Sequence, residues 1–148
     1  MSAPEPPPTF ALLNEIGIIE QLASTLFESR LPDGVLVSHF SVLNHLARRG
    51  DGATPLSLAT AFQVPKTTMT HTLQGLERRG WIAMEPNPRD GRSKIVRLTE
   101  AGRAFAAEAV AALAPDIAEI ERAVPRERIE ATLPVLREIR AFLDAARD

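Results

Sequence analysis

The feature that most constrains the fold is a change of hydrophobic period at Gly80 that reverses at Thr99. Before Gly80, apolar residues recur at spacings of three and four, which is typical of helices. Two short apolar runs, residues 81–84 and 95–98, then flank a ten-residue loop rich in turn formers and charge, which predicts a β-hairpin. The helical period then resumes, so the chain is predicted to be mainly α with a small β-hairpin.

Four helices are predicted before the hairpin. The first, residues 9–30, has Thr9 as its expected cap and is apolar over so much of its circumference that it needs cover on more than one side. A second helix ends at Gly50, and Thr54 with the proline after it is expected to open a short third helix. The fourth helix is expected over residues 66–79.

The Ala-rich region after the hairpin predicts two further helices. One long helix is expected from Thr99 towards Val124, and Pro125 is expected to open the other. Pro115 and Pro134 fall inside these helices and are expected to kink them. The predicted organisation is a mobile Pro-rich arm (1–8), an N-terminal dimerisation helix (9–34), a winged helix-turn-helix lobe (35–100) and C-terminal dimerisation helices (101–148).

The formal net charge of −2 conceals a basic segment in the middle of the chain. Residues 66–103 carry eight basic and four acidic side chains, whereas both flanks are acidic. A cationic face suits phosphate, which favours a nucleic acid as the partner. A solvated surface that is simply rich in arginine remains the alternative on charge alone.

The fourth predicted helix has a polar face with the chemistry to read DNA. If Met69, Leu73 and Leu76 face inwards, helical geometry puts hydroxyl, imidazole and amide groups on the opposite and flanking faces. These groups hydrogen-bond base edges or phosphates, while Arg78 and Arg79 suit contact with the DNA backbone. An ordinary solvated polar face is the competing interpretation.

A helix, a turn, a second helix and a basic hairpin follow one another as in a winged helix-turn-helix. The stretches TPLSLATAF, QVPKTTMTHTLQGLERRGW, PNPRDGRSK and IVRLTEAGR carry the similarity, so that residues 54–103 resemble the DNA-binding core of the MarR family of bacterial transcription regulators. Asp90, Gly91 and Arg92 fit the Asp-x-Arg signature of the wing. The resemblance implies that Arg92 enters a minor groove and that Asp90 pairs with a nearby arginine, of which Arg89 is the nearest in sequence.

Three positions depart from the family pattern. Pro65 stands where a Ser or Asp usually caps the recognition helix, so Thr67 or Thr68 is expected to take over the cap. His71 replaces a common arginine, and Gly75 stands where a stronger helix former is expected. These differences leave the operator sequence open but not the docking mode.

The predicted function is a sequence-specific regulator of transcription that binds double-stranded DNA, with a ligand-responsive repressor as the favoured form. It is expected to act as a homodimer on a pseudo-palindromic operator. A winged-helix module for protein assembly without specific DNA binding is the alternative. The candidate DNA-binding residues are Lys66, Thr67, Thr68, Thr70, His71, Gln74, Arg78, Arg89, Asp90, Arg92, Ser93 and Lys94.

Catalysis and metal binding have little support in the sequence. No GxSxG elbow, phosphate-cradling glycine loop or cysteine is present, so neither an enzyme nor a cofactor is predicted. His39 and His45 are six residues apart, which does not align them on one helix face for a metal ion. Ordinary surface or half-buried histidines are the favoured interpretation.

The family resemblance also implies a cleft for a small aromatic effector. Phe10, Phe27, Phe40 and Trp81 are candidates to line it, although plain core packing is the favoured role for apolar residues at helical spacing. A family member without a ligand is the other alternative.

The sequence predicts a soluble cytoplasmic protein with no membrane partner. No uninterrupted apolar run approaches the roughly 20 residues needed to span a bilayer. The start, MSAPEPPPTF, lacks the basic region and apolar stretch of a secretory signal.

Overall fold

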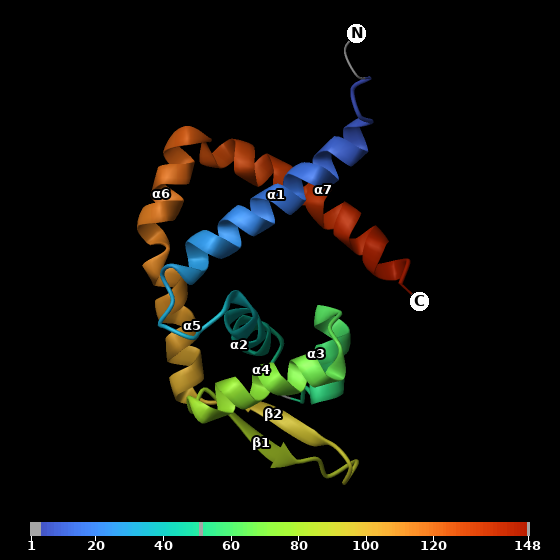
Figure 1. The fold of residues 1–148 in the computed structure, drawn as a ribbon, viewed down its shortest axis with the longest axis vertical. Helices are drawn as coiled ribbons and strands as arrows, with labels where there is room; N and C mark the ends of the chain where they lie inside the picture. Colours follow the sequence, from blue (N-terminus) through green and yellow to red (C-terminus); the bar gives the residue numbers. More distant parts are fainter. Residues whose placement is uncertain (1–3, 51, 148) are drawn as a thin grey trace. The chain divides into compact units, whose positions relative to one another are not determined.

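The computed structural model describes residues 4–50 and 52–147 and is helical apart from one hairpin (Figure 1). The chain divides into two compact units, Met1–Ala112 and Leu113–Asp148. Of the predicted N-terminal arm, residues 1–3 lie outside the described residues, and residues 4–7 are exposed without regular structure. The elements are α1 (Pro8–Glu28), α2 (Val37–Arg49), α3 (Pro55–Phe62), α4 (Lys66–Arg78), β1 (Ile82–Pro86), β2 (Lys94–Leu98), α5 (Glu100–Ala112), α6 (Ala114–Ala123) and α7 (Arg126–Ala145).

Two of the predicted helix boundaries are wrong. Helix α1 begins at Pro8 after Pro7 rather than at a Thr9 cap, because a proline in the first turn is already set to helical φ. The long helix expected after the hairpin is two helices, α5 and α6, separated at Leu113. Pro115 occupies the first turn of α6, where its missing N–H costs no hydrogen bond, so it starts a helix rather than kinking one.

The core of the first unit is built from α2, α3, α4, the hairpin and α5. The inward face predicted for α4 is confirmed, since Met69, Leu73 and Leu76 are all buried. The buried residues of this cluster are Val42, Leu43, Leu46, Leu58, Ala59, Met69, Leu73, Leu76, Ile82, Val96 and Ala106. The unit therefore includes α5, beyond residue 100 where the predicted lobe ended.

The hairpin is joined to the rest of the unit through the middle of β2. Strands β1 and β2 are antiparallel, with Ile82 opposite Leu98 and Pro86 opposite Lys94. The N–H of Val96 donates to the carbonyl oxygen of Ala53 at 2.8 Å, so the segment before α3 pairs with β2. This contact leaves the loop between the strands as the freely projecting tip (Figure 1).

Thr99 joins the end of α4 to the start of α5. Its hydroxyl donates to the carbonyl oxygen of Gly80 at 2.7 Å and accepts from the N–H of Gly102 at 3.0 Å. Its own N–H donates to the carbonyl oxygen of Trp81 at 3.1 Å. The stretch LTEAGR thus has a structural role, because Thr99 caps α5 while holding it against the turn that ends α4.

Helix α1 has no buried residue, although it is strongly apolar. Phe10 is 61% exposed and Leu22 66% exposed, and Leu13 and three isoleucines between them are also exposed. With 21 residues and a mean hydropathy of 1.2, α1 is long and apolar enough to cross a membrane, contrary to the sequence-based expectation. One such helix gives weak support for a membrane span, because core helices of soluble proteins pass the same test.

The second unit consists of α6 and α7, neither of which contains a buried residue. Pro125 precedes α7 as predicted, and Pro134 lies inside it. Large apolar side chains are exposed on both helices, including Phe142 at 73%.

Candidate nucleic-acid interface

Helix α4 begins without a side-chain cap and ends at a left-handed glycine. Pro65 precedes it and contributes no capping bond. The replacement cap by the Thr67 or Thr68 side chain that the sequence suggested is not formed. Gly80 has a φ of +73°, a conformation that favours glycine. The helix is held mainly by its apolar face in the core.

The outer face of α4 carries the predicted contact residues, and all of them are exposed. The inward position of Met69, Leu73 and Leu76 places Thr67, Gln74 and the residues around them on the opposite side of the helix. The Thr70 hydroxyl already donates to the carbonyl oxygen of Lys66 at 2.9 Å, so it remains available only as an acceptor. The exposed candidates on α4 are Lys66, Thr67, Thr68, Thr70, His71, Gln74 and Arg78.

Helix α4 and the hairpin both line a shallow pocket of about 220 Å³. Thr70 and Gln74 from α4 line it beside Lys94 from β2. Two separately predicted groups of contact residues are therefore neighbours in the fold. The remaining lining residues are Pro55, Leu73, Glu77 and Met84.

The hairpin tip is shaped by two side chains that bond to backbone. The Asn87 Oδ1 accepts from the N–H of Arg89 at 3.0 Å, and the Asp90 Oδ1 accepts from the N–H of Arg92 at 2.9 Å. Such turns fix a loop without regular structure. Within the described residues, Asp90 and Arg89 form no ion pair. The Asp90 carboxylate binds the backbone N–H of Arg92.

The charged side chains of the hairpin differ in how they are engaged. Arg97 forms an ion pair with Glu85 across the strands at 2.7 Å. Arg89, Arg92 and Lys94 are exposed and form no ion pair among residues 4–50 and 52–147, while Ser93 is half-buried. With one carboxylate, Asp90, among these three cations, the tip offers net positive charge to an anionic partner.

The close approach of His39 explains the glycine inside α4. A Cβ added to Gly75 would lie 3.0 Å from the Nε2 of His39, which is tighter than nearly all real contacts of this kind. The Nδ1 of His39 accepts from the N–H of Leu36 at 2.9 Å and so caps the start of α2. The position where the sequence suggested a stronger helix former is therefore one that the His39 side chain of α2 approaches closely.

The surroundings of His39 favour the neutral form of its imidazole. Burial lowers its pKa most, and the positive charges of Arg79, His71 and Arg78 lower it further. Burial likewise lowers the pKa of His45, with Arg49 and Arg48 adding to the effect. In the described part of the chain, His, Asp and Glu side chains form no group of three or more that could hold a metal ion.

The Arg79 side chain forms a hydrogen bond within the protein, whereas that of its neighbour Arg78 forms none within the described residues. The Arg79 Nη2 donates to the carbonyl oxygen of Asp33 at 2.8 Å, and its guanidinium lies 5.2 Å from the centre of the Trp81 ring. Arg79 thus has an internal contact that the sequence did not predict, while its side chain is exposed like that of Arg78. Sequence alone gave no signal for this, because Asp33 lies 46 residues away.

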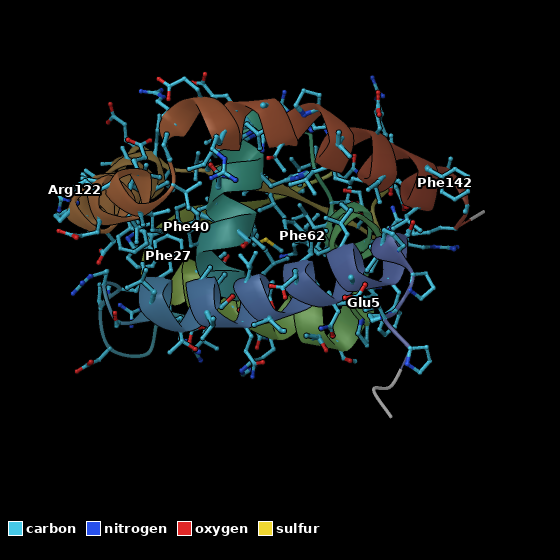
Figure 2. All side chains as sticks on the ribbon, turned by 90° about the horizontal axis from the view of Figure 1, so that it is seen from above. Glu5, Phe27, Phe40, Phe62, Arg122 and Phe142 are labelled. Atoms are coloured by element: carbon cyan, nitrogen blue, oxygen red, sulfur yellow. The ribbon has the colours of Figure 1, made fainter. Side chains whose placement is uncertain are left out.

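Three of the four aromatic residues proposed for an effector cleft pack against one another and their neighbours. Phe27 and Phe40 meet edge to face with ring centres 4.5 Å apart, as Figure 2 shows for the labelled pair. Trp81 stacks on Phe105 at 3.8 Å. These rings surround the buried residues Leu31, Val35 and Ala109, so they act as core, whereas Phe10 is exposed.

A helix-turn-helix backed by a two-stranded wing defines the class of the first unit, which is a winged-helix domain. In agreement with this fold, residues 33–93 match the sequence model of the MarR family.

Solved structures extend the similarity to nearly the whole chain. A MarR crystal structure shares 20% identity with a TM-score of 0.82, covering 99% of this chain and 97% of the other. The transcriptional regulator BldR from Sulfolobus solfataricus shares 24% identity with a TM-score of 0.77, covering 90% and 94%. A mutant MarR from E. coli, solved with operator DNA, shares 24% identity with a TM-score of 0.72, covering 87% and 93%. The chain therefore has the fold of these regulators, and the match to the MarR family model covers its residues 33–93.

Proposed function

We propose that this protein is a sequence-specific DNA-binding regulator of transcription that acts as a homodimer. The observation that carries the proposal is the juxtaposition of Gln74 on α4 with Lys94 at the base of a basic tip. A polar helix face and a cationic hairpin side by side match what a major groove and the adjacent backbone require. The similar MarR from E. coli was solved with operator DNA, which adds support.

The roles of the contact residues follow from their chemistry. Gln74 and His71 are assigned to base edges, because amide and imidazole groups pair with donors and acceptors in the major groove. Lys66 and Arg78, at the two ends of α4, are assigned to phosphates. Arg92 is assigned to a minor groove, where a narrow A·T-rich segment concentrates negative potential. The remaining candidates, Thr67, Thr68, Thr70, Arg89, Asp90, Ser93 and Lys94, are assigned to supporting contacts or to the shape of the tip.

The homodimer is supported by the exposed apolar surface of α1. A monomer rarely leaves a contiguous apolar surface of this kind in water. Two copies related by a two-fold axis would cover it, and the exposed apolar residues of α6 and α7 suit the same purpose. This assignment also accounts for the hydropathy of α1 without a membrane and agrees with a cytoplasmic protein.

Repression and response to a small aromatic effector are the finer parts of the proposal. Both rest on the family resemblance, because three of the four aromatic candidates, Phe27, Phe40 and Trp81, pack in the core. A repressor that releases DNA when an effector binds needs only a differential affinity for the two states.

Selection from a random double-stranded DNA library tests the proposal directly. The selected sequences should form a pseudo-palindrome with half-sites about one helical turn, roughly 10 bp, apart. Gln74→Ala should then relax preference at particular bases at a cost of about 1–3 kcal/mol, whereas Arg78→Ala should weaken all sequences and reduce the salt slope by about one. Failure to enrich any sequence, together with no salt-sensitive binding, would favour the protein-assembly alternative.

A further inference from the structure

We propose that Arg79 is a positioning residue that ties the recognition helix to the turn after α1 and thereby fixes which operator spacing the dimer accepts. The proposal rests on the proposed function, because spacing matters only to a DNA-binding dimer. It begins from the contrast between two adjacent arginines at the end of α4.

Arg79 is held from two sides. Its Nη2 reaches the carbonyl oxygen of Asp33 at 2.8 Å, and its guanidinium lies over the Trp81 ring at 5.2 Å. Gly34 leaves room for this contact, since a Cβ there would lie 3.3 Å from the same nitrogen and its φ is +79°. Arg78, one residue earlier, is exposed like Arg79 but makes no hydrogen bond or ion pair within the described residues.

The turn around Asp33, to which Arg79 donates, is held to the end of α1 by a hydrogen bond. The Glu28 Oε1 at the end of α1 accepts from the N–H of Val37 at the start of α2, at 3.0 Å. Leu31 and Val35 are buried on either side of Asp33. A displacement of α1 is therefore carried to the Asp33 carbonyl rather than absorbed by a loose loop.

The other side of the Arg79 contact leads into the winged-helix core. Trp81 stacks on Phe105 of α5 with an interplanar angle of 12°, and the Trp81 carbonyl accepts from Thr99. Arg79 thus connects a turn fixed to α1 with a tryptophan fixed to the wing and α5. A planar guanidinium serves this purpose because one face stacks while its edge donates.

The consequence concerns the distance between the two recognition helices of a dimer. If α1 forms the subunit contact, the position of each α4 relative to the two-fold axis is set through the turn at Asp33 and through Arg79. Loss of this connection should leave each half-site interface intact while letting the separation of the two helices vary. The operator spacing that fits best should then be less sharply defined.

The test compares Arg79→Met with Arg78→Met, which removes the same charge from the adjacent position. Affinity is measured for the selected operator, for operators with one or two base pairs added to or removed from the spacer, and for an isolated half-site. For Arg79→Met, the ratio between the best and the altered spacers should fall about fivefold or more, the lower range of coupling between sites. Its half-site affinity and its salt slope should stay as in the wild type.

For Arg78→Met, all operators and the half-site should weaken together, and the spacer preference should persist. A wild-type spacer profile for Arg79→Met, or a uniform loss with a smaller salt slope, would overturn the proposal. If Arg79→Met does not fold, as judged by its melting curve, Arg79→Lys carries the test because lysine keeps the charge but not the planar fork. A wild-type profile for Arg79→Lys would equally overturn it, while no DNA binding by the wild type would count against the proposed function itself.

Discussion

Gly102 of α5 lies against the backbone of Trp81 so closely that a Cβ on Gly102 would stand 2.0 Å from the Trp81 carbonyl oxygen. The same carbonyl accepts the N–H of Thr99, so neither side of the contact is free to retreat. The first turn of α5 therefore requires a glycine for space rather than for backbone conformation.

Gly102→Ala should destabilise the protein by at least about 3 kcal/mol, because the overlap involves backbone and cannot be relieved by a side-chain rotation. Urea unfolding followed by circular dichroism measures the change. Gly91→Ala is the matched control, since nothing lies within 4 Å of a Cβ at that position, and its effect should stay within about 0.5 kcal/mol. Equal stability of the two variants would show that the contact between α5 and Trp81 is looser than described.

The lowered pKa of His39 predicts a loss of stability in mild acid. The imidazole takes up a proton less readily in the folded protein than in the unfolded chain, where its pKa is near the ordinary value of 6.5. As the pH falls below about 6.5, the unfolded state therefore binds more protons and the free energy of unfolding decreases. Well above pH 6.5 the imidazole is neutral in both states, so the free energy of unfolding should no longer depend on this group.

His39→Gln should reduce the pH dependence between pH 7.5 and pH 5.5 without removing it. A glutamine at this position retains an acceptor for the N–H of Leu36. His45, whose pKa is also lowered, is expected to contribute part of the remainder, so His45→Gln serves as the second arm. Unfolding in urea at both pH values checks this, and an unchanged slope in His39→Gln would exclude His39 as a source.

Asp90 separates a structural role from a simple charge effect. Asp90→Ala removes a negative charge near the proposed DNA phosphates but also deletes the acceptor that holds the N–H of Arg92. We expect weaker operator binding by Asp90→Ala and binding at least as tight as wild type by Asp90→Asn, which keeps the oxygen. Fluorescence anisotropy at fixed salt measures both, and tighter binding by Asp90→Ala would favour the charge effect.

The proposed subunit contact can be tested on α1 with a surface-matched control. Ile19 on α1 and Leu56 on α3 are both 59% exposed. Ile19→Glu should convert the dimer to a monomer or an insoluble protein, because a charge cannot be buried unpaired at an apolar contact. Light scattering should find Leu56→Glu unchanged. A dimeric Ile19→Glu protein would move the contact away from this face.

Local patterns predicted much of the winged-helix lobe. Thr54 caps α3 as expected, and its side chain accepts from the N–H of Ser57. The inward face of α4 also follows from spacing alone, because a helix must bury its apolar stripe. The separation of α5 from α6 was missed, because a proline reads alike whether it interrupts a helix or starts one.

Long-range contacts explain what the sequence could not reveal. From sequence alone, Gly75 weakens α4, and only the fold shows that the His39 side chain of α2 lies against it. Arg78 and Arg79 are indistinguishable as a pair of basic residues, and only the fold brings Asp33 to one of them. The Asp90 carboxylate accepts from the backbone N–H of Arg92 rather than pairing with an arginine side chain, and this depends on the geometry of the loop.

The most direct test of the central claim is the affinity of Arg92→Ala for the selected operator, measured by fluorescence anisotropy at fixed salt. Arg122→Ala is the control, because it removes the same charge from α6, where Arg122 is paired with Glu119. We predict that Arg92→Ala binds about tenfold or more weakly, within the range of a specific contact, with an unchanged dimer and melting temperature, and that Arg122→Ala binds like the wild type. An Arg92→Ala protein with wild-type affinity would contradict the assignment of the hairpin tip to DNA.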